Sequence, residues 1–269
     1  MIAPLDVRFY DAKWRYYGAK RDLAPEIARI TGISSIVISS GRFTAHRYSV
    51  AERMSWAAQR ETTREEDLAY CLFGIFEVNL PLLYGEGSRA FIRLQEEIVR
   101  NSNDLTVFAW QAKEPSVRGI FARSPSEFTH AKGILSWPLI NPEYAVTNRG
   151  LRIETHLIKG PSSNRAGNGS VHFMSLWCRR SDMPKSMHIG IWLKSDWGYY
   201  YRIKANELPV QNEQSRSEKG AKKLLYIVRD VEANDTSGAR LAAHPNDVDW
   251  DLSSIQQDQL RESSSLFWE

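Results

Sequence analysis

Apolar residues recur every three to four positions along the first 110 residues, which is the spacing of helices that bury one face. This pattern, with Gly32 as a C-cap, predicts a short helix over residues 22–31. A strand over residues 7–10 precedes this helix, and a loop over residues 33–48 follows it. The N-terminal part is therefore expected to be rich in helices.

Two capping patterns predict where the next helices begin. Ser49 and Glu52 have the spacing of a capping box, in which a hydroxyl and a carboxylate accept hydrogen bonds from free backbone N–H groups. A helix is therefore expected to run from Ser49 to about residue 59. Thr63 and Glu66 repeat the spacing. The helix that they begin has an apolar face formed by Leu68, Cys71, Leu72 and Ile75.

A third helix is predicted over residues 88–100. It follows a break at residues 79–81, where the Asn-Leu-Pro sequence ends the preceding helix. Arg93 and Glu97 lie one turn apart on the polar side of this third helix, so they are expected to form an ion pair.

After about residue 110 the pattern changes to alternation of apolar and polar residues. Residues 151–157 alternate in this way, which is typical of a half-buried strand. Further strands are predicted over residues 171–178, 188–194, 199–204 and 224–229. Short strands joined by polar loops favour an antiparallel sandwich or a small barrel. The sequence thus predicts an α+β protein with a helix-rich part at residues 1–110, a β-rich domain at 111–230 and a polar, loosely ordered tail at 231–269.

The most specific signal in the chain is the order of residues 49–98, which read SVAERMSWAAQRETTREEDLAYCLFGIFEVNLPLLYGEGSRAFIRLQEEI. This stretch resembles the fungal heterokaryon-incompatibility (HET) family, whose members carry a cytosolic module that triggers cell death when genetically unlike hyphae fuse. The resemblance covers about residues 1–110, as the C-terminal part of the HET module and the segment after it. Residues 144–158, YAVTNRGLRIETHLI, more loosely resemble the β-rich part that follows. In the family a long N-terminal portion precedes the tract at residues 2–18, so this chain is expected to be an N-terminally truncated copy.

The resemblance implies a role in self/non-self recognition or regulated cell death through protein contacts, with a full-length relative or another incompatibility protein as partner. In the family the module resembles the TIR-like α/β fold, for which a nucleotide (NAD)-cleaving activity is suspected by analogy. The early strands and the candidate catalytic acid of that fold belong to the absent portion, so no catalytic residue is assigned and enzymatic action by this chain is the rival interpretation. Without those strands, the strand at residues 7–10 is expected to leave an open edge of a parallel sheet. Either the true protein starts further upstream, or this strand pairs with the second half or with another chain.

Charged residues cluster before the second of the capped helices, at Glu61, Arg64, Glu66 and Asp67. Paired carboxylates can act as general acid and base. Carboxylates in the first turn of a helix are also stabilised by the helix dipole and by capping. Capping and solvated ion pairs are the favoured interpretation, and Arg64 and Asp67 are also candidates for clamping neighbouring helices.

A glycine-rich loop precedes the third helix, at Tyr84, Gly85, Glu86 and Gly87. The backbone N–H groups of such a loop can bind phosphate. Glu86 would repel a phosphate, and the loop follows a proline-broken segment instead of a strand. A tight turn that needs positive φ at the glycines is therefore favoured.

Aromatic residues are concentrated in the second half, at Trp177, Trp192, Trp197, Tyr199, Tyr200 and Tyr201. They can form a β-sheet core, or they can line a groove for a glycan or another ligand. Because alternate residues of a strand face opposite ways, Tyr200 is expected to point away from Tyr199 and Tyr201, and one face is expected to expose aromatic surface.

Composition narrows the classes of partner. The 269 residues include 35 basic and 32 acidic residues, scattered along the chain, which disfavours nucleic acid as a partner. The histidines form no HxxxH or HxH pair, and two cysteines are too few for a zinc cluster, so neither a metal nor a cofactor is predicted. No apolar run is long enough to span a membrane. The low cysteine count fits a reducing compartment, so a cytoplasmic protein is expected. No pattern in the sequence sets the oligomeric state.

Overall fold

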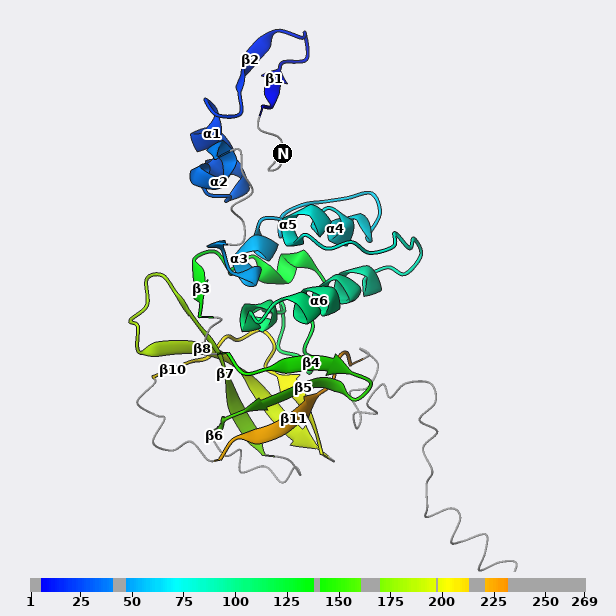
Figure 1. Ribbon diagram of the computed structural model, residues 1–269, viewed down its shortest axis with the longest axis vertical. Helices are drawn as coiled ribbons and strands as arrows, with labels where there is room; N and C mark the ends of the chain where they lie inside the picture. The colour runs from blue at the N-terminus through cyan, green and yellow to red at the C-terminus, as the bar shows by residue number, and fades with distance from the viewer. Residues whose placement is uncertain are drawn as a thin grey trace, which may run out of the picture. The chain divides into compact units, whose positions relative to one another are not determined.

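The computed structural model describes residues 6–40, 47–137, 141–160, 170–196, 198–212 and 221–231. The helices are α1 (Ala24–Thr31), α2 (Ser35–Ser39), α3 (Val50–Ser55), α4 (Asp67–Tyr70), α5 (Phe73–Phe76) and α6 (Arg89–Asn101), with the 3-10 helices η2 (Leu105–Phe108) and η3 (Pro125–Phe128). The strands are β1 (Arg8–Tyr10), β2 (Tyr16–Ala19), β3 (Ile134–Ser136), β4 (Tyr144–Thr147), β5 (Gly150–Thr155), β6 (Leu157–Lys159), β7 (Val171–Arg180), β8 (Met187–Asp196), β9 (Tyr199–Ile203), β10 (Val210–Asn212) and β11 (Lys223–Ile227). The predicted α+β class is confirmed (Figure 1). Residues 232–269 of the predicted tail lie outside the described residues.

Strands β3 to β11 form one sheet, in the order β3-β7-β8-β9-β11-β5-β4. After His156 the chain of β5 continues as β6, which pairs with β7, so the path of hydrogen-bonded strands returns to β7. The pairing of β11 with β9 is parallel, whereas the other pairings in this sheet are antiparallel. A single sheet that closes on itself is nearer to the expected small barrel than to two stacked sheets.

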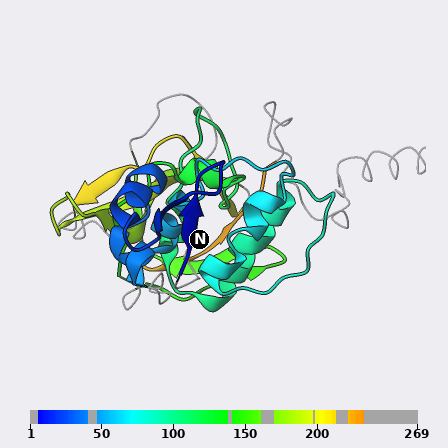
Figure 2. The same cartoon turned by 90° about the horizontal axis from the view of Figure 1, so that it is seen from above.

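One continuous hydrophobic core joins helices α3 to α6 to this sheet, whereas α1 and α2 pack in a separate small core. Leu94 of α6, Val107 of η2 and Ile191 of β8 are all fully buried in the continuous core. Seen from above, α3 to α6 overlie the strands (Figure 2). Fully burying a side chain such as Leu94 contributes about 1.5–3 kcal/mol relative to leaving it exposed. The predicted domain boundary near residue 110 falls within this core and stays a prediction.

Local capping signals placed several helices correctly. Gly32 ends α1 with a φ of +71°, as expected for a glycine C-cap. Ser49 begins α3, because its hydroxyl oxygen accepts a hydrogen bond from the backbone N–H of Glu52 at 3.2 Å. Helix α3 is shorter than predicted, and α2 lies in a segment that was expected to be a loop.

Two predictions for the region between α3 and α6 were wrong. The helix expected after Thr63 is divided into α4 and α5, and no side chain caps the start of α4. The expected ion pair within the third helix does not form either. Arg93 pairs with Glu86, which lies in the loop before α6, and Glu97 pairs with Arg100. Because the loop folds back on α6, Arg93 pairs with Glu86 of the loop instead of with Glu97 of the helix.

Strand β1 does not belong to a parallel sheet. It pairs antiparallel with β2 in a two-stranded hairpin, with Arg8 opposite Ala19 and Phe9 opposite Gly18. The expectation that the second half or another chain covers this strand was therefore wrong, because the covering strand follows directly along the chain.

The expected aromatic face on β9 was also wrong. Tyr200 and Tyr201 are both buried, and Tyr199 is half-buried. Strand β9 lies between β8 and β11, and the backbone of Arg118 pairs with that of Arg202. Trp177 and Trp192 are half-buried, and Trp197 lies outside the described residues.

Candidate functional site

The two clusters singled out in the sequence form one site. The glycine loop, defined here as residues 82–87, folds against the start of α4. The Glu66 carboxylate oxygen Oε1 accepts hydrogen bonds from the backbone N–H groups of Gly85 at 2.7 Å and Gly87 at 3.0 Å. Both glycines have positive φ, +97° and +56°, as the sequence predicted. The carboxylate of Glu66 therefore fills the position that a phosphate would take in such a loop.

Hydrogen bonds from backbone N–H groups lower the pKa of the Glu66 carboxyl. The largest cause is its own backbone N–H, followed by those of Gly87 and Gly85. Because the side chain is turned into the loop, Glu66 caps the loop instead of the helix, which explains why the predicted capping box with Thr63 does not form. The glycine loop is thus held by a buried carboxylate of the same chain.

Tyr70 and Arg93 hold the two ends of the glycine loop. The Tyr70 hydroxyl donates to the carbonyl oxygen of Leu83 at 2.6 Å and accepts from the N–H of the same residue at 2.8 Å. Arg93 on α6 forms an ion pair with Glu86 and donates to the carbonyl oxygen of Pro81 at 2.9 Å. Burial raises the pKa of the Tyr70 hydroxyl, so this phenol stays a neutral hydrogen-bonding group.

Tyr84 connects the remaining charged residues of the cluster. Its hydroxyl donates to Oδ1 of Asp67 at 3.0 Å, and the Arg64 guanidinium lies 4.6 Å from its ring centroid. The bond to Asp67 raises the pKa of the Tyr84 hydroxyl. Glu61 is exposed, and none of the hydrogen bonds or ion pairs among the described residues joins it to the cluster. Arg64 and Asp67 thus clamp the glycine loop to α4.

The outer side of the glycine loop can serve as a contact surface. The carboxylates of Glu66, Asp67 and Glu86 are all bound within the loop network, as described above. On the outer side, Leu82 and Leu83 remain 58% and 51% exposed. A rigid loop with exposed apolar side chains has the properties of a contact surface for another macromolecule.

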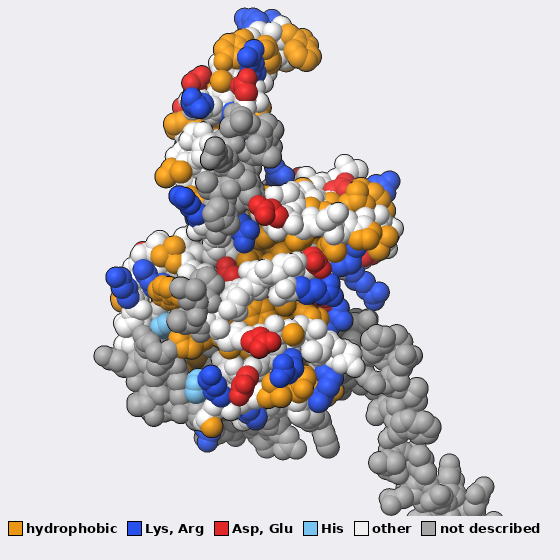
Figure 3. All heavy atoms as spheres, in the orientation of Figure 1, with side chains coloured by type: hydrophobic (Ala, Val, Ile, Leu, Met, Phe, Trp, Pro, Cys, Tyr) orange, Lys and Arg blue, Asp and Glu red, His pale blue; other side chains and the backbone are white. Residues whose placement is uncertain are grey.

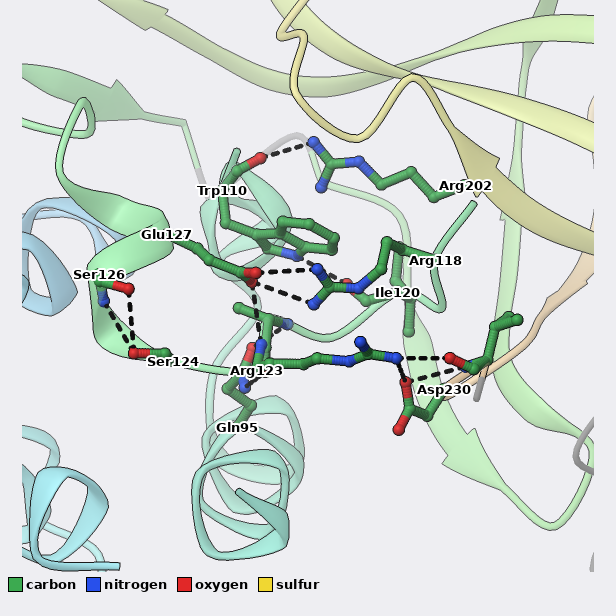
Figure 4. Close-up of polar contacts among 12 residues, drawn as sticks. Gln95, Trp110, Arg118, Ile120, Arg123, Ser124, Ser126, Glu127, Arg202 and Asp230 are labelled. Carbon is green, nitrogen blue, oxygen red and sulfur yellow. Dashed lines mark hydrogen bonds and ion pairs between the residues drawn. The ribbon is translucent and has the colours of Figure 1, made fainter. Parts of the chain in front are cut away.

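A second polar network, which the sequence analysis missed, surrounds the buried Trp110 (Figure 4). Arg202 of β9 is fully buried and donates to the carbonyl oxygens of Phe108 at 3.0 Å and Trp110 at 2.6 Å. Its guanidinium lies 3.8 Å from the Trp110 ring centroid. Burial lowers the pKa of Arg202 to about 9. One signal was present in the sequence: a single arginine inside the aromatic and apolar strand YYYRI.

Arg118 and Gln95 extend this Trp110 network toward the helices. Arg118 lies 4.9 Å from the Trp110 ring centroid and donates to both carboxylate oxygens of Glu127, at 2.9 and 3.2 Å. Gln95 of α6 donates to the carbonyl oxygen of Ala122 at 2.8 Å and accepts from its N–H at 3.0 Å. The network ties α6, η2 and η3 to β9, so we assign it a structural role.

Among the described residues, three or more His, Cys, Asp or Glu side chains are nowhere arranged to hold a metal ion. No helix within the described part of the chain is long and apolar enough to cross a membrane.

Comparison with known proteins gives one domain-family match and one similar protein, and each covers only part of the chain. Residues 89–132 match a domain of unknown function, DUF8212, and this segment contains Gln95, Trp110, Arg118 and Glu127. Over 106 residues, the chain is 42% identical to the vegetative incompatibility protein HET-E-1 of Podospora anserina. Part of this chain is therefore similar to an incompatibility protein. The match spans 39% of this chain and 8% of HET-E-1. No solved structure matches the chain significantly.

Similarity to HET-E-1 confirms the part of the predicted resemblance that concerns incompatibility proteins. That the matching segment is the end of a HET module, and that the module has a TIR-like origin, stay predictions.

Proposed function

We propose that this chain is an incompatibility-type protein of the cytoplasm, acting in self/non-self recognition or regulated cell death through protein contacts. The observation that carries the proposal is the 42% identity to HET-E-1 over 106 residues. The partner class we propose is a full-length relative or another incompatibility protein.

The glycine loop supports a role in protein contacts. Its backbone is fixed by Glu66 and Tyr70, while Leu82 and Leu83 point outward (58% and 51% exposed). A partner that buries these side chains need not order the loop, which lowers the entropic cost of association. The rival interpretation, a nucleotide-cleaving enzyme, would gain from an open anion site, but at this loop the Glu66 carboxylate occupies the N–H groups.

Cell fusion tests the proposal. The gene is deleted in the organism that encodes the protein, and the viability of fused cells is scored for genetically unlike and like pairs of strains. We expect deletion to change viability in unlike pairs and to leave like pairs unaffected. Equal viability of unlike pairs with and without the gene would contradict the proposal.

Complementation separates the contact surface from general stability. The deletion strain receives the wild-type gene, the Leu82→Ser/Leu83→Ser variant, or the control variant Leu135→Ser/Leu224→Ser, which changes two other exposed leucines. We expect the control to restore the wild-type response and the loop variant to fail at equal protein level. A loop variant as active as the control would remove the loop from the proposal.

A further inference from the structure

The β1–β2 hairpin exposes an aromatic surface that the candidate site does not use. We define the hairpin face as Tyr10, Trp14 and Tyr16, which are 47%, 83% and 58% exposed. The ring centroid of Tyr10 lies 6.1 Å from that of Trp14 and 5.8 Å from that of Tyr16, so three rings form one surface. Hydrophobic side chains gather over this hairpin beside Lys and Arg side chains (Figure 3).

Hydrogen bonds to the Asp11 side chain hold the turn that carries Trp14. The Asp11 carboxylate accepts hydrogen bonds from the backbone N–H groups of Lys13 and Arg15, at 2.9 Å each, and from the Arg15 guanidinium at 2.7 Å. Trp14 has a φ of +59°, a conformation that residues other than glycine rarely adopt. Strained backbone held by surrounding contacts is typical of ligand clamps and other functional sites. The backbone that carries Trp14 is thus held in place before a partner binds.

The other side of the hairpin packs inward. Phe9 contacts a small core that includes Ile27 of α1 and Val37 of α2. A side-chain Cβ at Gly18 would lie 3.1 Å from the side chain of Leu23, so the hairpin backbone lies close to that residue. The register shifts between Phe9 and Tyr10, which indicates a bulge that turns the following residues. The side of the hairpin that carries Phe9 is therefore buried against other described residues. The side that carries Tyr10, Trp14 and Tyr16 is exposed.

Basic side chains surround the hairpin face. Residues 6–22 include five basic and three acidic residues, and all of the basic ones except Lys20 are exposed. Two of the three carboxylates already form ion pairs, Asp6 with Arg8 and Asp11 with Arg15. Lys13, next to Trp14, is exposed and takes part in no ion pair among the described residues. Charge complementarity therefore favours an acidic occupant.

We propose that the hairpin face binds an acidic peptide segment of a partner protein. Apolar side chains of that segment pack on the rings, and its carboxylates lie near Lys13. Tyr, Trp and Arg are the residues most enriched at interface hot spots. A membrane surface fits less well, because three of the five residues at 11–15 are charged and one of them is an aspartate. This inference is independent of the proposed function.

Peptide selection on the purified full chain tests the inference. A random dodecapeptide phage library is selected on immobilised wild-type protein, and the recovered peptides are titrated against three proteins by fluorescence anisotropy. The proteins are the wild type, the hairpin variant Trp14→Ser/Tyr16→Ser, and the control Ile30→Ser/Ile36→Ser, which changes two other exposed apolar residues in the same part of the chain. Urea unfolding curves establish that both variants are folded.

We expect the recovered peptides to be acidic and to contain apolar residues. Their affinity should fall at least about tenfold for the hairpin variant and stay unchanged for the control. Lys13→Glu should also weaken binding and reduce its dependence on salt. Recovered peptides without acidic bias, or equal affinity for the hairpin variant, would overturn the inference.

Two further measurements distinguish other occupants. The first is cosedimentation of the chain with vesicles of phosphatidylcholine and phosphatidylserine, and the second is the mass in solution by light scattering. Vesicle binding that requires Trp14 and Tyr16, without peptide binding, would identify a membrane occupant and overturn the inference. A dimer that dissociates in the hairpin variant would do the same in favour of a second copy.

Discussion

The glycine loop and the Trp110 network use the same chemistry in different surroundings. Each combines arginines, carboxylates and aromatic rings, and each connects segments far apart in the sequence. Around Trp110 the central arginine, Arg202, is fully buried and its partners are backbone carbonyl oxygens. At the glycine loop the central group is a carboxylate, Glu66, and the side chains beyond it face solvent. The first network therefore stabilises the fold, whereas the second shapes a surface.

The largest effect is expected at Arg202. Replacement by Met leaves the carbonyl oxygens of Phe108 and Trp110 buried without a hydrogen-bond donor, so we expect the free energy of unfolding to fall by about 2–5 kcal/mol. Urea unfolding followed by tryptophan fluorescence measures it. The matched control is Arg149→Met, because Arg149 also lies over an aromatic ring, 4.1 Å from the centroid of Tyr226, but is exposed. The control should lose about 1 kcal/mol or less. Equal losses would contradict the structural role of the Trp110 network.

A smaller effect is expected at the glycine loop, from backbone conformation alone. Gly85→Ala should lower the free energy of unfolding by about 1–3 kcal/mol, because Ala is strained at a φ of +97° although no atom lies within 4 Å of the added Cβ. Gly74 of α5 has the same open space without the positive φ, so Gly74→Ala should instead stabilise by about 0.5–1 kcal/mol. The same urea titration compares the two. If both substitutions have the same sign, the loop conformation described here is wrong.

The smallest effect is expected from the charge of Glu66, and it depends on pH. Because the pKa of this carboxyl is lowered in the folded state from its usual 4.5, its contribution to stability is present above pH 4.5 and is lost as the pH falls through the folded pKa. Wild type should therefore be more stable than Glu66→Gln near neutral pH, and the difference should shrink below pH 4.5. Glu61→Gln, which changes an exposed carboxylate, serves as the control. A Glu66→Gln difference that is constant across this pH range would show that the ionised carboxylate does not hold the loop.

Local signals in the sequence predicted part of the local structure. The Ser49 cap, helix α6 and the positive φ of Gly85 follow from residues close together in the chain. Helix α2 was missed because the short run Ser-Ile-Val-Ile-Ser has no clear helical period. The division of α4 from α5 was also missed, because apolar residues at helical spacing suit two short helices as well as one long helix.

Contacts between distant residues could not be predicted in this way. Glu66 lies 19 residues from Gly85, and the charged cluster and the glycine loop were analysed as separate motifs with separate chemistry. Arg202 reaches carbonyl groups 94 and 92 residues away, and no local pattern specifies such a pairing. The arrangement of these partners depends on how the helices and the barrel share one core.

The Glu66 carboxylate occupies the N–H groups of the glycine loop, which makes the loop a rigid surface element. Amide hydrogen exchange of Gly85 and Gly87, measured by NMR with and without inorganic phosphate, tests this occupancy. We predict that both amides are protected in the wild type, that Glu66→Gln removes the protection, and that phosphate leaves the wild-type rates unchanged. Unprotected amides in the wild type, or protection that increases when phosphate is added, would contradict the claim and indicate an open anion site.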